Sequence, residues 1–357
     1  MPTRAPIRPL LLVCYLAACG GDEASDASAV AGAQPLSTVW PAPEGGRLEY
    51  RVQIRFGEEL ENKSPSQAMP AGWKLGRVSG VASDAQGDVY VLHRGTDADP
   101  VVVFDRQGTR MLRSWGRGMF TKPHGIRVDP DGNVWITDLG DHRVLKFSRD
   151  GGLIFELGER GRPGNTEGHF NRPADIAFGP NGDVYVVDQG EDEERPGLGD
   201  PRVVRISPDG TYLGQWGAPG HGPGEFHFPH SIAVDSRGTV YVSDRENNRV
   251  QLFDPEGGFL REWTHLGSTM SLVITPEDEL WMLNDPDNIQ ILTYDALAGR
   301  IMRVDPATGR VLGSMASPGH MLDVSASGDL YVASLTGNVF RFYPGWLVER
   351  DGGIVPR

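Results

Sequence analysis

The chain has 357 residues, enough for one large or two ordinary domains with a real hydrophobic core. Its 47 glycines and 27 prolines favour many tight turns over long helices. The formal net charge of −14 excludes the basic surface that phosphate backbones require, so we expect no nucleic-acid partner.

The first residues are typical of an export signal. Arg4 and Arg8 precede the apolar run PLLLVCYLAA, which is too short to span a bilayer as a helix. LAAC, ending at Cys19, resembles a bacterial lipobox, in which the cysteine becomes the lipidated first residue. We therefore predict a lipoprotein signal peptide over residues 1–18 and lipid on Cys19. A plain secretory signal is the alternative.

Residues 19–46 are predicted to be the lipid-attachment cysteine and a flexible tether, because they are small, polar and proline-containing. Cys14 would leave with the signal and Cys19 would carry lipid, so the folded part would have no thiol or disulfide and would be held by packing. We expect a chain anchored by lipid in the bacterial cell envelope, at the outer membrane or facing the periplasm. Gly20 after Cys19 favours the outer membrane.

A repeated phrase sets the predicted architecture. An apolar strand, a turn and an alternating strand recur at spacings of roughly 40–56 residues, a period typical of propellers and solenoids. The six copies start at Ser79, His124, Ala174, His230, Met270 and His320.

Each copy predicts four antiparallel strands. Aspartate-glycine or asparagine-glycine turns join the first two, and segments such as RVLKFS and LIFELG supply the third and fourth. The sequence thus predicts an all-β fold, a six-bladed β-propeller of four-stranded blades over residues 47–350, with a tail at 351–357. Residues 48–57 would lead into the first copy, and ring closure would join the two chain ends.

Histidines open copies two, four and six at the same offset, eight residues before the turn position. In a closed ring these blades are about 120° apart, so the imidazoles of His124, His230 and His320 would converge on the axis if the first strands line the channel. Three neutral nitrogens with a free position make an open catalytic zinc site. The alternative is that each histidine only caps a turn.

Two arginines follow second strands and so lie at the same end of their blades as the histidines. Arg94 follows His93 in copy one, and Arg245 follows Asp244 in copy four. Guanidinium groups beside a metal suit a carboxylate-bearing substrate. The alternative is that both are ordinary loop residues, with Arg245 paired to Asp244 or Glu246. His142 is predicted to be a loop or supporting group.

The phrases PHGI, PHSI and DREN, with the general G-x-V-Y-V-x-D pattern, resemble NHL-repeat propellers and, more closely, the peptidyl-α-hydroxyglycine α-amidating lyases. The similarity covers nearly all of residues 48–345. It implies that His124, His230 and His320 hold a catalytic zinc and that Arg94 and Arg245 lie in the active site. It also implies cleavage of a C-terminal α-hydroxyglycine to a peptide amide and glyoxylate.

The chain departs from the pattern of that family at two places. The family's catalytic tyrosine would follow the second strand of copy three, where Gly190 stands before an acidic insertion. A metal-bound hydroxide or one of Glu191, Asp192, Glu193 and Glu194 could supply the base instead. The family's structural calcium uses an aspartate where this chain has Met321, so calcium is doubtful even if Val81 and Ile126 offer carbonyls.

The sequence leaves three functions open. The first is an exported, zinc-dependent lyase acting, as a monomer, on a small carboxylate-bearing or peptide C-terminal substrate. The second is a non-catalytic NHL propeller that binds a protein or envelope ligand. The third is a different metal-dependent hydrolase or lyase, such as a lactonase, because function depends on the site and not on the fold.

Overall fold

A computed structural model describes residues 69–190, 200–285, 299–317 and 319–344, and the backbone of five strands outside these ranges. These five are β1 (Trp40–Pro41), β2 (Arg47–Leu48), β3 (Tyr50–Arg55), β29 (Leu347–Arg350) and β30 (Gly353–Pro356). The predicted signal peptide, Cys19 and most of the predicted tether lie outside the described residues, so those assignments stay predictions.

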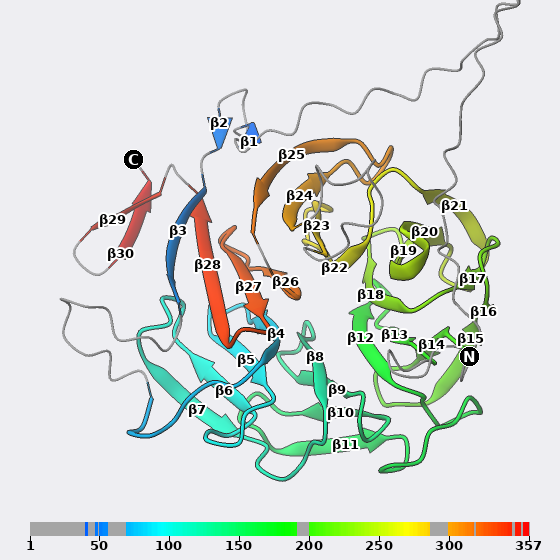
Figure 1. Ribbon diagram of the computed structural model, residues 1–357, viewed down its shortest axis with the longest axis horizontal. Coiled ribbons are helices and arrows are strands. Elements are labelled where there is room, and N and C mark those ends of the chain that lie inside the picture. Colours follow the sequence, from blue (N-terminus) through cyan, green and yellow to red (C-terminus); the bar gives the residue numbers. More distant parts are fainter. Residues whose placement is uncertain are drawn as a thin grey trace, which may run out of the picture. The chain divides into compact units, whose positions relative to one another are not determined.

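Six four-stranded antiparallel sheets make up the fold (Figure 1), which confirms the predicted six-bladed propeller. Blade one is β4 (Val78–Ser83), β5 (Val89–His93), β6 (Val101–Phe104) and β7 (Met111–Trp115). Blade two is β8 (Pro123–Val128), β9 (Val134–Asp138), β10 (Arg143–Phe147) and β11 (Leu153–Leu157). Blade three is β12 (Pro173–Phe178), β13 (Val184–Asp188), β14 (Arg202–Ile206) and β15 (Tyr212–Trp216).

The second half of the ring repeats this plan. Blade four is β18 (Pro229–Val234), β19 (Val240–Asp244), β20 (Arg249–Phe253) and β21 (Phe259–Trp263). Blade five is β22 (Thr269–Ile274), β23 (Leu280–Asn284), β24 (Arg300–Val304) and β25 (Val311–Ala316). Blade six is β26 (Met321–Val324), β27 (Leu330–Ser334), β28 (Asn338–Pro344) and β3.

Blade six closes the ring with a strand from the other end of the propeller. β28 pairs antiparallel with β3, and Phe342 lies opposite Val52. The predicted strand at residues 48–57 therefore belongs to the last blade as its outer strand, and the expected joining of the two chain ends is confirmed. The first strands contact one another in a closed cycle, from β4 through β8, β12, β18, β22 and β26 back to β4.

The core lies between adjacent blades, and β5 shows how the sequence places it. Val89 and Val91 pack into a cluster shared with blade six, whereas Tyr90 and Leu92 pack into a cluster shared with blade two. Successive side chains of a strand point to opposite faces, so a strand between two neighbours must be apolar on both. The continuous run VYVL meets that need, and every one of these side chains is fully buried.

The turn after each first strand lies where the sequence predicts it, eight residues after the start of the copy. Gly87 and the other turn glycines have positive φ, which a residue without Cβ adopts at little cost. In blade five Asp278 holds the same position with φ of 60°. Aspartate tolerates this left-handed conformation better than most residues, so the repeat continues without its glycine.

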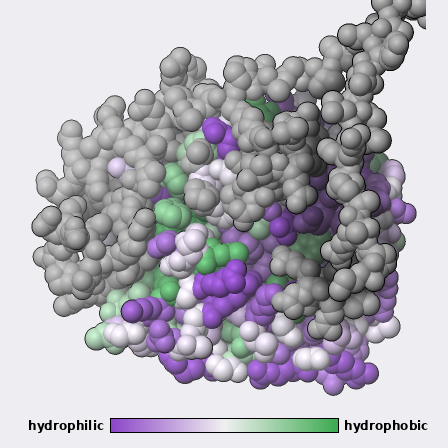
Figure 2. Space-filling model, viewed as in Figure 1, coloured by the Kyte–Doolittle hydropathy of each residue, from purple (hydrophilic) through white to green (hydrophobic). Residues whose placement is uncertain are grey.

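The outer strands meet solvent. In the space-filling view the coloured surface at the bottom is mostly hydrophilic, with small apolar patches (Figure 2). Among the residues whose burial the structure describes, the large exposed hydrophobic side chains belong to β11, β15 and β21: Leu153, Ile154, Leu213, Phe259 and Leu260. Within the part of the chain that the structure describes, no helix has the length and apolar character needed to cross a membrane.

Candidate metal centre

The three predicted histidines meet at one end of the central channel. His124 and His230 are the second residues of β8 and β18, and His320 directly precedes β26. Their exposed fractions are 3%, 2% and 5%. One ring nitrogen from each lies within 4.8 Å of the others. The ring centroids are 4.9, 4.8 and 5.1 Å apart, so the imidazoles from alternate blades converge as predicted.

Each imidazole is oriented by a hydrogen bond to the next blade. The Nδ1 atom of His124 lies 2.8 Å from the carbonyl oxygen of Ala174, and that of His230 lies 2.6 Å from the carbonyl of Met270. Nδ1 of His320 lies 2.8 Å from the carbonyl of Ser79. A carbonyl only accepts, so Nδ1 carries the proton and Nε2 keeps its lone pair. The partners are the first-position residues of the neighbouring blades, so one geometry occurs three times.

Burial also keeps these imidazoles neutral. It lowers the pKa of His124 and His230 well below the ordinary value, with further lowering from neighbouring histidines and arginines. For His320, burial lowers the pKa to about 3, and the charges of Arg94 and Arg245 add to the effect. A neutral imidazole has the free lone pair that a metal ion requires, so protons do not compete at neutral pH.

The donor set fits a metal ion. Three neutral imidazoles, each with its Nδ1 proton held by a carbonyl, are typical of protein sites for zinc and other ions that prefer nitrogen ligands. Three protein ligands also leave a coordination position for substrate. The three histidines could thus hold a metal, and zinc is the ion that the sequence predicts.

A ring of six residues follows the second strands, each fifteen positions after the start of its copy. Its members in blades one to six are Arg94, Leu139, Gln189, Arg245, Asp285 and Leu335. In an antiparallel hairpin the second strand ends where the first begins, so this ring lies at the histidine end of the channel. Both arginines are close enough to the triad to lower the pKa of His230 and His320. The two arginines therefore lie at the same end of the channel as the histidines, and their part in an active site stays a prediction.

Each arginine is held by specific contacts. Nε of Arg94 donates to the carbonyl oxygen of Pro123, directly before His124, at 2.9 Å. Arg245 pairs with Asp285 of blade five, its Nη2 atom 2.9 Å from the carboxylate, and it stacks over the ring of Phe228. The Glu246 carboxylate is farther away, at 3.7 Å.

Of the two partners considered from the sequence, Glu246 forms an ion pair with Arg245, whereas Asp244 is held by other residues of blade four. Asp244 accepts hydrogen bonds from Arg249 and Asn247 of its own blade. Arg245 begins the short 3-10 helix η1 (Arg245–Asn247), which directly follows β19.

Asp285 is the site residue that sequence reasoning missed. Its side chain is 7% exposed, it pairs with Arg245, and its charge raises the pKa of His320. The signal that could have found it is the same fifteen-residue offset that places Arg94 and Arg245. Among the described residues, Asp285 is the only carboxylate at this offset.

Blade three carries no tyrosine at the expected place. Gly190 has φ of 68°, and a Cβ added there would lie 2.5 Å from the backbone of Asp200, so no side chain fits. Its neighbour Gln189 is 1% exposed, and its Oε1 atom has no hydrogen-bond partner among the residues that the structure describes. The acidic residues 191–194, considered as substitutes, lie outside the described residues.

Calcium does not fit the place that the resemblance indicated. Met321 stands where the carboxylate ligand would be, and its side chain is 1% exposed in the apolar cluster between blades six and one. The guanidinium of Arg127 donates to the carbonyl oxygen of Leu322, 3.0 Å away. The positive charge of this guanidinium would repel a calcium ion bound beside the Leu322 carbonyl.

Two other histidines have structural roles. Nδ1 of His93 accepts hydrogen bonds from the backbone of Gly76 and Gly95, at 3.2 and 2.9 Å, so the ring supports the loop that carries Arg94. His142 lies in the turn between β9 and β10 with φ of 57° and accepts from the backbone of Arg172. His142 therefore serves the loop, as expected.

Comparison with known proteins gives matches over most of the chain. The NHL repeat model matches residues 120–147 and 226–253, which include His124 and His230. Peptidylglycine α-amidating monooxygenase of Rattus norvegicus is 35% identical over 265 residues, 65% of this chain and 25% of that protein. The chain thus spans about a quarter of the length of that relative.

Two relatives are covered over most of their length. NHL repeat-containing protein 3 of Mus musculus is 32% identical over 286 residues, which are 74% of this chain and 79% of that protein. A probable peptidyl-α-hydroxyglycine α-amidating lyase of Caenorhabditis elegans is 25% identical over 298 residues, 73% of this chain and 81% of that protein.

Solved structures share the fold at low identity. A streptogramin B lyase superimposes with a TM-score of 0.54 and 15% identity, over 83% of this chain and 98% of that one. A gluconolactonase of Xanthomonas campestris gives a TM-score of 0.55 and 16% identity, over 87% of this chain and 99% of that one. At these identities the likeness concerns the propeller and not the chemistry.

Proposed function

The chain belongs to the NHL-repeat propeller family, and we propose that it is an exported zinc-dependent lyase that cleaves a peptidyl-α-hydroxyglycine-type substrate to an amide and glyoxylate. The observation that carries this proposal is the triad of His124, His230 and His320, with each Nδ1 bonded to a carbonyl of the next blade. The homologues named as amidating lyases or amidating monooxygenases support the reaction class.

The two arginines would bind the carboxylate of the substrate. Arg94 and Arg245 stand at equivalent positions of blades one and four, both next to buried imidazoles. A guanidinium fork recognises a carboxylate through two parallel hydrogen bonds, and its charge persists at every physiological pH. Binding at the carboxylate would leave the α-hydroxyl facing the triad.

A zinc ion on the three Nε2 atoms would act as a Lewis acid and lower the pKa of a substrate hydroxyl. We assign the removal of the hydroxyl proton to Asp285. Proton transfer to its carboxylate lets the C–O bond become the aldehyde C=O of glyoxylate while the C–N bond breaks. The electron pair of that bond would go to nitrogen, and Asp285 would return the proton to this nitrogen to give the amide.

Gln189 would contact the peptide side of the substrate. Its buried Oε1 atom finds no hydrogen-bond partner within the described part of the chain, and such an atom costs free energy unless a donor is supplied to it. The scissile amide N–H is a donor of the right kind. We place Gln189 there because it occupies the blade-three position of the ring that also holds Arg94 and Arg245.

The cellular setting follows from the chain's first residues. Lipid on Cys19 would hold the propeller, as a monomer, at the outer membrane or facing the periplasm. The substrate would then be a small carboxylate-bearing molecule or a peptide C-terminus in that compartment.

An assay for glyoxylate tests the proposal. Untagged, zinc-loaded protein is incubated with α-hydroxyhippurate, and glyoxylate and benzamide are measured against a His124→Ala control. Equal amounts of both products from the parent chain, and none from the variant, support the lyase. A zinc-loaded sample that releases neither product contradicts it and favours another metal-dependent enzyme of the same fold. A folded protein that binds no metal favours the binding propeller.

A further inference from the structure

A buried ion pair joins blades two and three inside the channel, beyond the histidines. Arg127 of β8 donates to both carboxylate oxygens of Asp175 of β12, with Nε–Oδ1 and Nη2–Oδ2 distances of 2.9 and 2.7 Å. The side chains of Arg127 and Asp175 are 11% and 0% exposed. Two parallel hydrogen bonds are the strongest geometry for this pair and fix the orientation of the guanidinium.

The same guanidinium reaches two more blades. Nη1 donates to the carbonyl oxygen of Leu322 in blade six at 3.0 Å, and Nη2 lies 3.5 Å from the carbonyl oxygen of Leu272 in blade five. Ser231 of blade four donates to the Asp175 carboxylate at 2.6 Å. The ion pair is therefore the centre of a network that connects blades two to six.

The electrostatics keep Arg127 charged. Burial alone would lower its pKa, but the carboxylates of Asp175 and Asp323 outweigh that effect and the pKa is raised. Asp323 is itself fixed by Ser83 of blade one, whose hydroxyl donates to it at 2.5 Å. A buried cation is tolerated only where carboxylates and carbonyls replace its water, and both are present here.

We propose that the guanidinium of Arg127 is the structural cation of this channel. It joins oxygen atoms of several blades, as a bound metal ion would otherwise do. Carbonyl and carboxylate oxygens are the ligands of a hard cation such as calcium, and here they accept N–H groups instead. Three members of the network lie close to a triad member in sequence: Arg127 follows His124 by three residues, Ser231 follows His230, and Leu322 follows His320 by two. Arg127 is thus a positioning residue that holds together the strands carrying all three histidines.

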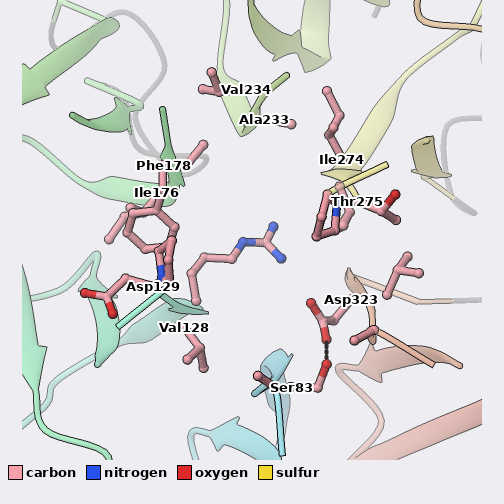
Figure 3. A pocket seen from close by; sticks show the side chains of 18 of the residues that line it. Ser83, Val128, Asp129, Ile176, Phe178, Ala233, Val234, Ile274, Thr275 and Asp323 are labelled. Atoms are coloured by element: carbon pink, nitrogen blue, oxygen red, sulfur yellow. Dashed lines mark hydrogen bonds between the residues drawn. The ribbon is translucent and has the colours of Figure 1, made fainter. Parts of the chain in front are cut away.

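The channel beyond Arg127 is open to small solutes. A cavity of about 600 Å³ is lined by Arg127 and by the ends of the first strands and their turns from all six blades. Figure 3 shows labelled side chains of these strands around the cavity, with Ser83 hydrogen-bonded to Asp323. None of the three histidines lines it. Removal of the Arg127 side chain would leave a space, rimmed by oxygen atoms, that an added cation can enter.

Thermal unfolding of the full chain, with and without millimolar calcium, tests the proposal. The parent protein is expected to melt at the same temperature in both buffers, because the cation in its channel is the Arg127 side chain and no added ion is needed. Arg127→Ala is expected to lower the Tm by about 10 °C, since it leaves buried carboxylates unpaired. Millimolar calcium or guanidinium, far below denaturing concentrations, should restore part of that loss.

Arg341→Ala is the matched control. Arg341 is 1% exposed and pairs with Asp329 of the same blade at 3.0 Å, and Asp329 also pairs with Arg106 of blade one at 2.7 Å. This variant should also melt earlier, without recovery on addition of calcium. Arg127→Lys, which keeps the charge but not the fork, should lie between the parent and Arg127→Ala.

Two results would overturn the inference. One is a Tm of the parent protein that rises with calcium, which would show that a metal site is still present. The other is an Arg127→Ala protein that melts like the parent. If Arg127→Ala does not fold, the inference can still be tested with two measurements. These are the change in Tm of the parent protein on addition of calcium and the Tm of Arg127→Lys. None of these measurements depends on the proposed reaction.

Discussion

The Nδ1 atom of His320 lies 2.8 Å from the carbonyl oxygen of Ser79, so the third histidine of the triad binds the last blade to the first. The equivalent bonds join blade two to three and blade four to five. A metal ion on the three Nε2 atoms would join blades two, four and six across the channel, and so connect these three pairs of blades. Metal binding and propeller stability are therefore expected to be coupled.

Metal removal should lower the melting temperature. An ion that binds the folded chain at a thousandfold excess over its Kd stabilises it by about 4 kcal/mol, which corresponds to about 10 °C for a domain of this size. Calorimetry before and after chelation, followed by addition of one equivalent of zinc, measures the shift and its reversal. An unchanged Tm after complete chelation would mean that the triad holds no ion.

Replacement of the proposed proton acceptor should separate binding from chemistry. Asp285→Asn keeps an oxygen that accepts from Arg245 but cannot take a proton, so kcat should fall by about 10²–10⁴-fold while KM and zinc content stay near the parent values. Formate added to Asp285→Ala should restore part of the rate, because a small carboxylate can enter the space. A rise in KM alone, without rescue, would leave Asp285 only the role of orienting Arg245.

The two arginines should act mainly on substrate binding. Arg94→Lys and Arg245→Lys keep the positive charge but lose the second parallel hydrogen bond to a carboxylate. We expect kcat/KM for α-hydroxyhippurate to fall by about 10–100-fold in each, the cost of one charged hydrogen bond. The control substrate is the amide of α-hydroxyhippurate, which lacks the carboxylate. An equal loss for both substrates would argue against carboxylate recognition.

The metal-free protein should lose stability in mild acid. Burial lowers the pKa of His320 from 6.5 to about 3. Between pH 6.5 and pH 3, this imidazole is therefore protonated in the unfolded chain but neutral in the folded chain. Folding stability should accordingly be constant above pH 6.5 and fall as the pH drops toward 3, by up to about 1.4 kcal/mol per pH unit for each such histidine. Urea unfolding of chelated protein from pH 8 to 4 measures the slope. His320→Asn, which cannot titrate, should show a smaller slope than the parent.

The repeat made most of the fold predictable from the sequence. The offset from each first-position residue to its turn survives even in blade five, where Asp278 replaces glycine. This regularity places His124, His230 and His320 at one height on alternate blades, so a one-dimensional pattern could predict that the imidazoles meet.

The partners of the charged residues could not be predicted in the same way. Arg245 and Asp285 are forty positions apart on neighbouring blades, and only the closed ring brings them together. Arg127 has the sequence context of an ordinary strand residue. Its contacts with Asp175 and Leu322 depend on how β8, β12 and β26 pack around the axis. Such contacts follow from tertiary packing, which local patterns do not encode.

Metal analysis combined with anomalous diffraction tests the account most directly. Crystals of untagged protein, measured on both sides of the zinc absorption edge, should show one peak within bonding distance of the Nε2 atoms of His124, His230 and His320. Solution analysis should give about one zinc per chain, lost in His320→Ala. A fully folded, zinc-equilibrated protein with no peak between these imidazoles would contradict the metal site and the lyase chemistry built on it.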